Sequence, residues 1–309
     1  MTIMTNQAHV RPNVERRRPC EGAPTTNLMV AGRGLGSRAL RLYLPLALFL
    51  VGMLFPFYWM LITSIKPNRE LYNARIMPLI VHQPTLKHYV DLLYETNFLT
   101  WTYNTMLVAV VTTVVSVVLG TMMAYPLARM RFPGAAVVAI GVAATYLVPQ
   151  PLLFIPMSDI INRLELGNTL TAVMLTYPTL LIPFCAWLLM GYFKSVPREL
   201  EDAARIDGAS RLQAMTRIVL PLCTPGLLSA GIFAFTLAQN EFLYALIFLA
   251  KSDVRTVPVG AITELIRGDV FYWGQLMAAA LLGSVPVAII YSFFVEYYVA
   301  GLTTGSVKG

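Results

Sequence analysis

The side chains best suited to chemistry gather in one charged segment, residues 193–221, between two long apolar runs. Four acidic and five basic residues occupy it, so the segment has to lie in water. The acids are Glu199, Glu201, Asp202 and Asp207, and the bases are Lys194, Arg198, Arg205, Arg211 and Arg217. Two small residues, Ala203 and Ala204, stand beside the acids, and two large apolar ones, Ile206 and Leu212, interrupt the charges. Solvation alone requires none of these four, whereas docking into a groove of a partner protein does, so the pattern favours a docking loop.

The same segment predicts two short helices joined at a glycine. Pro197 suits the start of a helix, and Gly208 is a natural stop in the left-handed conformation. Ser210 is a suitable cap for a second helix that runs toward Ile218, and Pro221 marks the return to the apolar part of the chain. Acids lie early in these helices and a base lies late, which complements the helix dipoles. A loop that is only solvated would show the same charge placement, so this feature does not distinguish it from a docking loop.

The rest of the chain has the composition of a membrane protein. Of its 309 residues, 57% are hydrophobic and 13% are charged, far from an ordinary soluble domain. Apolar runs long enough to cross the hydrocarbon core cover about 44–63, 104–127, 135–157, 169–192, 222–249 and 276–298. The predicted fold class is therefore an all-α membrane protein with six transmembrane helices. Prolines inside several of these runs are expected to bend the helices and to shape a cavity.

The distribution of Lys and Arg predicts the orientation in the membrane. Fifteen of the 23 such residues lie in segments 1–43, 128–134 and 193–221 and at Lys308, which six spans would place on one side. Because Lys and Arg concentrate in cytoplasmic segments, both termini and the charged segment are predicted to be cytoplasmic. This distribution explains the net charge of +7, and we expect no nucleic-acid partner.

The chain divides into an N-terminal tail, 1–43, and a membrane part, 44–309. The tail has no apolar period and is expected to be disordered, with no role beyond topology, while the first apolar run is expected to be a retained helix rather than a signal peptide. The three cysteines, Cys20, Cys185 and Cys223, fall in the tail or within or beside predicted spans, so they predict no disulfide framework.

The spacing inside the charged segment resembles the coupling loop of ABC importer permeases. The family pattern is Glu-Ala-Ala, three residues, Gly, nine residues, and then Ile-x-Leu-Pro. This chain has the same order at the same spacings: Asp202, Ala203, Ala204, Gly208, Ile218, Leu220 and Pro221. The departure from the pattern is Asp202 in place of Glu, which keeps the charge but reaches one methylene less far.

Other residues resemble the carbohydrate-type permeases of that family, and the smaller maltose-type permease in particular. They are Asn104, Ala124, Tyr125, Leu127, Ala128, Arg129, Phe132, Pro133, Gly134 and the glycine-rich end 301–309. The resemblance runs from about Leu44 to the last residue and implies the type I ABC importer permease fold, with its core at about 100–298. It also implies a multi-pass protein of the bacterial inner membrane.

The resemblance further implies partners. A second six-helix permease would pair with this chain, a dimer of ABC ATPase subunits would dock on the 199–221 loop, and an external solute-binding protein would deliver a carbohydrate. Glu199, Glu201 or Asp202 would contact a basic residue of the ATPase, the two alanines would allow close approach, and Gly208 would make the corner.

Polar residues deep in the fifth predicted span are candidates for the translocation path. Asn240 and Glu241 lie roughly 27 Å from the start of that span at 1.5 Å per residue, where an ionisable group is costly unless it faces a cavity or a partner. They either line the path or its gate, or they hydrogen-bond to a neighbouring helix as packing. Tyr146 and Tyr177 have flat apolar faces with a hydroxyl, which suits sugars, although tyrosines in spans also serve as packing or interfacial residues. Typical relatives have Trp where this chain has Gln239, so sugar stacking at that position is in doubt.

An alternative is an ion-coupled secondary transporter with Glu241 as its proton or sodium site, although the six spans show no inverted repeat. Catalysis has no sequence support, because Gly-x4-Gly-Lys-Ser/Thr, His-Glu-x-x-His and Gly-x-Ser-x-Gly do not occur. His82 and His88, six residues apart with no neighbouring Cys or further His, are too weak a ligand set to predict a metal site. We expect no enzyme and no bound cofactor, with ATP and Mg²⁺ held by the partner ATPase.

Overall fold

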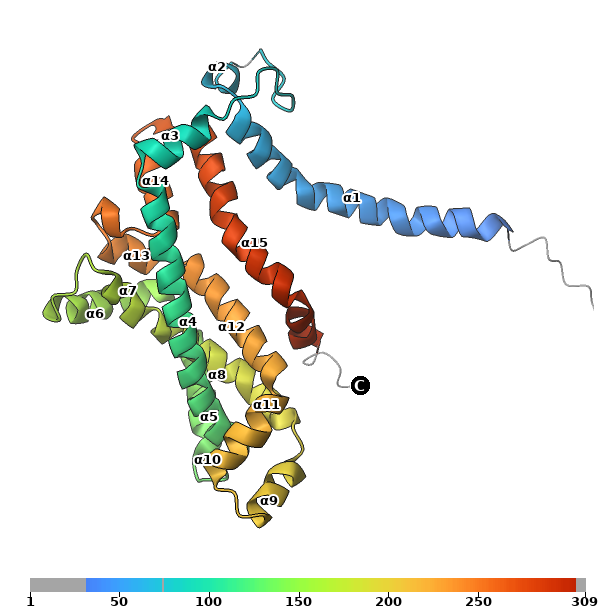
Figure 1. Ribbon diagram of the computed structural model, residues 1–309, viewed down its shortest axis with the longest axis vertical. Coiled ribbons are helices and arrows are strands. Elements are labelled where there is room, and N and C mark those ends of the chain that lie inside the picture. The colour runs from blue at the N-terminus through green and yellow to red at the C-terminus, as the bar shows by residue number, and fades with distance from the viewer. Residues whose placement is uncertain (1–31, 74, 304–309) are drawn as a thin grey trace, which may run out of the picture. The chain divides into compact units, whose positions relative to one another are not determined.

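A computed structural model describes residues 32–73 and 75–303 and shows a predominantly helical protein (Figure 1). By its internal contacts the chain divides into two units, 1–55 and 56–309. The described part of the first unit is helix α1 (Gly32–Ile65) as far as Phe55. The expectation of a disordered tail up to residue 43 is wrong for 32–43. Extending an existing helix adds one hydrogen bond for each residue fixed, so the helix of the first apolar run propagates backward at little cost.

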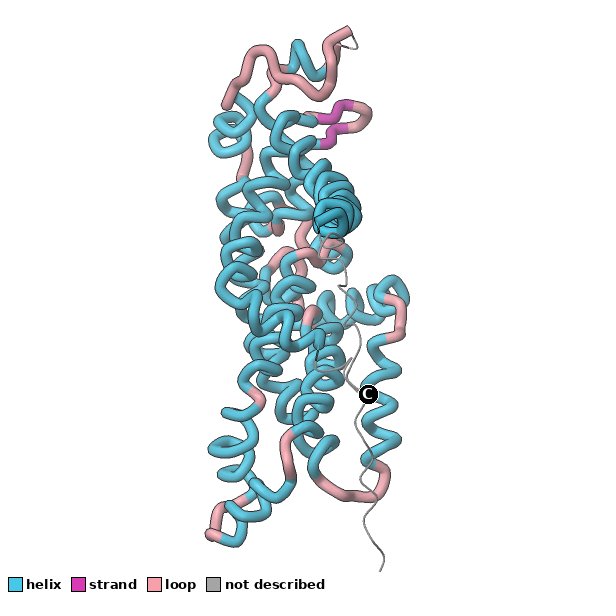
Figure 2. The backbone as a smooth tube through the Cα atoms, turned by 90° about the vertical axis from the view of Figure 1, so that its right-hand side faces the viewer, coloured by secondary structure: helices cyan, strands magenta, loops and turns pink. Residues whose placement is uncertain are grey.

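The second unit contains the last turns of α1 and all the later elements. These are α2 (Asn68–Leu71), α3 (Lys87–Glu95), α4 (Phe98–Arg129), α5 (Ala135–Tyr146), α6 (Gln150–Arg163), α7 (Leu170–Thr176), α8 (Pro178–Ser195), α9 (Arg198–Ile206), α10 (Arg211–Ala214), the π-helical turn η1 (Met215–Val219), α11 (Leu220–Leu222), α12 (Thr224–Gln239), α13 (Leu243–Phe248), the 3₁₀ turn η2 (Ser252–Val254), α14 (Val257–Leu265), β1 (Ile266–Arg267), β2 (Val270–Phe271) and α15 (Trp273–Thr303). The two strands pair in an antiparallel hairpin, coloured magenta in Figure 2.

The core of the second unit lies where α4 packs along α8 and α12 (Figure 1). Helices within a membrane gain little from the hydrophobic effect when they associate, so they depend on close van der Waals packing, which small residues allow. Gly120 of α4 provides such a contact, since a Cβ atom there would lie 2.7 Å from the Cβ atom of Cys185 on α8. Cys185 and Cys223 are buried free thiols, while Cys20 lies outside the described residues.

The six predicted spans are present as four helices that are long and apolar enough to cross a membrane and two bent pairs. Four spans, Arg41–Ile65, Phe98–Arg129, Leu170–Ser195 and Trp273–Phe294, agree with prediction to within a few residues at most ends. The bent pairs are Ala135–Tyr146 with Gln150–Arg163, at 94°, and Arg211–Leu222 with Thr224–Gln239, at 76°. The all-α membrane fold is therefore as predicted, but two of its spans are not single helices.

The bend of the first pair and the interruption of the predicted span 222–249 have local causes, and that interruption is separate from the 76° bend, which lies at Cys223 before α12. The predicted span 135–157 turns at Pro149, which has no N–H to continue a helix and disfavours helical geometry at the residue before it. The predicted span 222–249 is also wrong as one helix, because α12 ends at Gln239 and α13 starts only at Leu243. The carbonyl of Thr236 accepts both the backbone N–H of Asn240 at 3.2 Å and the side-chain amide of Asn240 at 2.8 Å, so a local side-chain bond adds to the last backbone bond of α12.

Candidate functional site

The charged segment folds as its residues predict, into two short helices at one end of the second unit (Figure 1). Pro197 is the residue that precedes α9, and Gly208 has φ +92°, the left-handed conformation that ends the helix. Ser210 caps α10 in a reciprocal arrangement. Its Oγ accepts from the N–H of Gln213 at 3.2 Å, and its own N–H donates to Gln213 Oε1 at 2.8 Å. This geometry holds the corner in one conformation.

The second helix of this loop differs from the prediction in one respect. After α10 the backbone widens into the π-helical turn η1, and helical geometry continues through Pro221 into α11 rather than stopping before it. Ile218 lies in η1 and is partly buried, as is Leu220 in α11, while Pro221 is exposed. A π-helical turn of this kind often marks a functional position in a helix.

Two large apolar side chains of the loop are exposed among its charged residues. Ile206 is 87% exposed and Leu212 is 67% exposed, although both are large hydrophobic residues on a segment rich in charge. The predicted coupling residues Glu199, Asp202, Ala203, Asp207 and Gly208 are exposed, while Ala204 is partly buried. Acids, small residues and large apolar side chains are thus exposed along α9, the Gly208 corner and α10, and we call these exposed residues the docking surface.

Glu201 does not lie on the docking surface. Its Oε1 accepts a hydrogen bond from Tyr125 Oη at 2.5 Å, and its Oε2 lies 3.7 Å from Arg129 Nε. Both partners belong to the end of α4. Their side chains belong to the motifs that carry the family resemblance, yet their contact with the loop was not foreseen. Tyr125 and Arg129 stand one helical turn apart at the end of an apolar span, and that spacing was the available signal.

A second candidate site is a cavity of about 670 Å³ that contains all four residues predicted for a translocation path. Tyr146 and Pro149 come from the break between α5 and α6, Asn240 and Glu241 come from the break between α12 and α13, and Tyr177 comes from the junction of α7 and α8. Irregular backbone at membrane depth is tolerated where it lines a cavity, and both helix breaks of this kind meet here.

The side chains around the cavity have different environments. Tyr177 is 1% exposed, whereas Tyr146 is 51% exposed, and the Tyr146 ring packs against Phe184 at 5.8 Å between ring centroids. Glu241 is 8% exposed, and its two carboxylate oxygens accept the N–H groups of Tyr244 at 2.9 Å and Ala245 at 3.2 Å. Glu241 therefore caps α13, a local structural task that neither proposed role had included.

Comparison with known proteins places these features in a family. Residues 116–304 match the family described as "Binding-protein-dependent transport system inner membrane component". The chain is 37% identical over 268 residues to the sulfoquinovosyl glycerol transport system permease protein of Agrobacterium fabrum, which covers 86% of this chain and 93% of the relative. It is 35% identical over 259 residues to the trehalose/maltose transport system permease protein of Thermococcus litoralis, which covers 83% and 92% respectively.

The fold has a counterpart among solved structures. The crystal structure of a bacterial ABC transporter involved in the import of the acidic polysaccharide alginate contains a chain that superposes with a TM-score of 0.70. The match covers 84% of this chain and 98% of the other, at 22% sequence identity. At that identity the comparison establishes the common fold.

Proposed function

Because the chain belongs to the family of inner membrane components of binding-protein-dependent transport systems, a family of multi-pass permeases rather than enzymes, we propose that it carries a carbohydrate inward using ATP hydrolysed by a separate subunit. Family membership decides against the ion-coupled alternative. The substrate class rests on the relatives, whose names specify a sulfonated glycoside in one case and neutral disaccharides in another.

The observation that carries the ATPase assignment is the docking surface. Leaving a large aliphatic side chain in water forgoes about 1.5–3 kcal/mol of burial for each residue, and Ile206 and Leu212 both do so within one short loop. A partner that covers them recovers this energy. The neighbouring carboxylates of Glu199, Asp202 and Asp207 would meet basic residues on the rim of the partner's groove.

The same proposal includes the remaining members of the complex. ATP and Mg²⁺ bind to the ATPase pair, a second six-helix permease stands beside this chain, and an external solute-binding protein delivers the sugar. Both termini and the docking surface face the cytoplasm, where ATP is available, in agreement with the excess of Lys and Arg in segments on that side.

The cavity between the two helix breaks is the proposed path for the sugar. Its volume of about 670 Å³ lies in the range of small-molecule sites, which is about 300–1,000 Å³. The exposed ring of Tyr146 provides an apolar face for a sugar ring, and the amide of Asn240 provides polar contacts. Glu241 contributes by holding the shape of the break through its cap of α13.

Co-purification tests the proposal. The tagged chain is extracted from native membranes in mild detergent, and the co-purifying proteins are identified by mass spectrometry and assayed for ATP hydrolysis. We expect a nucleotide-binding subunit and a second permease with the unmodified chain. Ile206→Ser should reduce recovery of the nucleotide-binding subunit at least tenfold, while Leu164→Ser, a control at an equally apolar exposed position after α6, should not.

Either of two results would reject this assignment. Recovery of the chain alone, under conditions that preserve a known transporter complex, removes the ATPase from the proposal. Equal recovery with both serine variants removes the docking surface from it. Uptake of labelled maltose, trehalose and a sulfonated glycoside by cells that produce the complex then identifies the substrate class, and failure to take up any sugar contradicts the carbohydrate assignment.

A further inference from the structure

Three side chains join the coupling loop to a helix that is distant from it in the sequence. Glu201 on α9 accepts from the hydroxyl of Tyr125 at 2.5 Å and lies 3.7 Å from Nε of Arg129, both near the end of α4. Tyr125 is 3% exposed, the Arg129 side chain is 3% exposed, and the Glu201 side chain is 15% exposed. The cluster is therefore an internal contact of the protein rather than a surface ion pair.

The direction of Glu201 separates it from its neighbour. The side chain of Asp202 is 66% exposed on the docking surface, whereas the carboxylate of Glu201 turns inward toward α4. Consecutive residues of a helix point about 100° apart, so one faces a partner while the next faces the protein. The two acids therefore serve different contacts.

Because Arg129 is buried, its contact with Glu201 has an energetic consequence. A buried guanidinium requires a counter-charge, and Glu201 is the acid within ion-pair distance of it in the described part of the chain. The Nε and Nη2 atoms of Arg129 have no hydrogen-bond partner among the described residues. Loss of the Glu201 charge would leave a buried cation without compensation, so removal of this acid should be costly.

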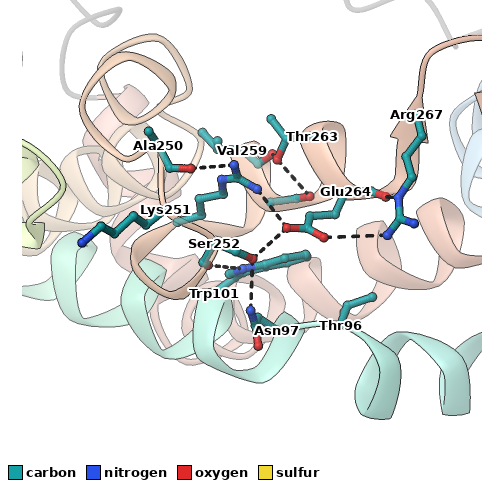
Figure 3. Close-up of polar contacts among 12 residues, drawn as sticks. Thr96, Asn97, Trp101, Ala250, Lys251, Ser252, Val259, Thr263, Glu264 and Arg267 are labelled. Atoms are coloured by element: carbon teal, nitrogen blue, oxygen red, sulfur yellow. Dashed lines mark hydrogen bonds and ion pairs between the residues drawn. The ribbon is translucent and has the colours of Figure 1, made fainter.

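The other end of α4 is bound just as specifically. Trp101 Nε1 donates to the carbonyl of Ser252 at 2.8 Å, Asn104 Nδ2 donates to the carbonyls of Asp253 and Arg255 at 3.0 Å each, and the N–H of Val257 donates to Thr105 Oγ1 at 2.8 Å. Figure 3 shows Trp101 and Asn97 against Ser252. Glu264 of α14 also hydrogen-bonds to this segment, residues 252–257.

The hydrogen bonds of Glu264 to segment 252–257 are short. Glu264 Oε1 accepts from Ser252 Oγ at 2.7 Å and from Arg255 Nη1 at 2.9 Å. Helix α4 is continuous over 32 residues, about 48 Å at 1.5 Å per residue, and its one proline, Pro126, lies between the tether residues Tyr125 and Arg129. A helix fixed at both ends transmits a displacement along its whole length.

We propose that Tyr125, Arg129 and Glu201 form a tether that passes the movement of the coupling helix to α4, and that α4 carries it to segment 252–257 on the opposite side of the membrane. The covalent chain already links α9 to α8 and, through α10 and η1, to α12. It gives α4 no such link, so apart from the packing of α4 along α8 and α12, this tether is the contact through which the coupling helix acts on α4 directly. The three residues are positioning residues, and their role rests on the proposed function.

The test uses the complete importer in proteoliposomes with its ATPase, second permease and binding protein. Glu201→Gln, Tyr125→Phe and the double variant are compared with Tyr103→Phe, an exposed tyrosine of the same helix. We expect the ATP hydrolysed for each sugar delivered to rise roughly fivefold or more with either single variant. The effect of the double variant should be smaller than the sum of the two single effects, because both changes disrupt one connected cluster. Recovery of the ATPase should stay unchanged.

A second readout follows the far end of α4. Lys251→Cys places a thiol at an exposed position beside segment 252–257, in a chain that also carries Cys20→Ser, since the two other cysteines are buried. Its labelling by a membrane-impermeant maleimide is measured with and without ATP and Mg²⁺. The nucleotide-dependent difference in labelling rate should be present with Tyr103→Phe and lost with Tyr125→Phe.

The outcomes separate the possibilities. If Glu201→Gln lowers ATPase recovery at least tenfold, as is expected of Ile206→Ser, Glu201 is a docking residue and the tether is refuted. If Tyr125→Phe leaves both the ATP-to-sugar ratio and the labelling difference intact, α4 receives no movement by this route. Absence of the ATPase from the unmodified complex would instead count against the proposed function. Tyr125→Phe removes one hydroxyl and keeps the ring, so it decides the matter even where Glu201→Gln does not fold.

Discussion

Replacement of Gly208 separates the shape of the coupling loop from its use as a docking surface. Gly208 has φ +92°, and a Cβ atom there would meet nothing within 4 Å in this chain. Gly268, in the β1–β2 hairpin, is a matched control, since its φ is +60° and its Cβ position is equally open. We consider Ala, Asn and Asp at each position, because Asn and Asp have nearly the same size but differ in charge.

The strain is similar at the two positions. A residue with a Cβ in the left-handed region costs about 1–2 kcal/mol, less for Asn and Asp, whose side chains tolerate that region. A loss of that size lowers the melting temperature of a domain of this length by roughly 2–8 °C. It leaves the protein folded, because typical stabilities are about 5–15 kcal/mol. Ala should therefore be the most destabilising of the three replacements at both glycines.

Docking should rank the same replacements differently. At Gly208 any side chain enters the space that the partner approaches, so Ala, the smallest, should be tolerated best, and Asp, which adds a charge beside Asp207, should be worst. We expect Gly208→Asp to insert normally but to reduce ATPase recovery and sugar uptake at least tenfold, equivalent to about 1.4 kcal/mol of binding energy. Gly268→Asp should leave ATPase recovery unchanged.

Three measurements on the same variants decide the matter: the amount of protein in the membrane, the melting temperature in detergent, and ATP-dependent uptake. Normal uptake with Gly208→Asp would refute the docking argument. Uptake that follows the melting temperature, with Ala worse than Asn, would show that the conformation of the corner matters and that the partner does not approach it.

Two further predictions concern acidic residues outside the docking surface. Glu241→Ala leaves two N–H groups of α13 without their acceptor, which should destabilise the protein by about 1–3 kcal/mol and raise the KM for uptake. Glu241→Gln should have intermediate effects, because its amide oxygen still accepts a hydrogen bond. Thermal unfolding measures the loss of stability, and uptake kinetics measure the KM. Burial acts to raise the pKa of Glu70, but the N–H groups of His82 and Gln83 outweigh it and hold that pKa below its ordinary value. Because the folded-state pKa is the lower one, this carboxylate stabilises the protein at neutral pH, and the contribution disappears as the pH falls through the folded-state pKa. The melting temperatures of the unmodified protein and Glu70→Gln should therefore differ at pH 7 and converge progressively as the pH falls below the ordinary glutamate pKa of about 4.3; a constant difference would contradict the assignment.

The coupling loop could be predicted from the sequence because its rules are local. A proline before the first turn, a glycine with positive φ and a serine cap each act within about four residues, and all three are where the sequence places them. The inward direction of Glu201 could not be predicted in this way. Its partner Tyr125 lies 76 residues away, and only the packing of α4 against the loop brings the two together.

In the membrane part, too, some features could be predicted from the sequence and others could not. The number of apolar runs follows from composition, but a run of apolar residues does not reveal whether its helix is continuous. Pro149 was a visible signal for the first break. The second has no proline or glycine, and the polar run Gln239, Asn240 and Glu241 was its signal. The run predicts a functional site inside a helix, whereas α12 ends at it, because the Glu241 carboxylate accepts the N–H groups of Tyr244 and Ala245 that a continuous helix would direct to backbone carbonyls.

The position of these breaks explains how a loop in water can act on a cavity within the membrane. Helix α12 begins at the 76° bend that follows the coupling loop and ends at Gln239, so it is about 24 Å long at 1.5 Å per residue. Its far end is the break that carries Asn240 and Glu241 into the cavity. Under the proposed function, a tilt of α12 caused by the ATPase changes the cavity directly, while α4 carries the same movement past the cavity to segment 252–257. Two rigid helices of different length, driven by one loop, would thus reach the cavity and the opposite side of the membrane in a single step. ATP can favour one arrangement only if it binds the two arrangements with different affinity, so loss of the α4 route should weaken sugar release from the binding protein while leaving the α12 route to open and close the cavity.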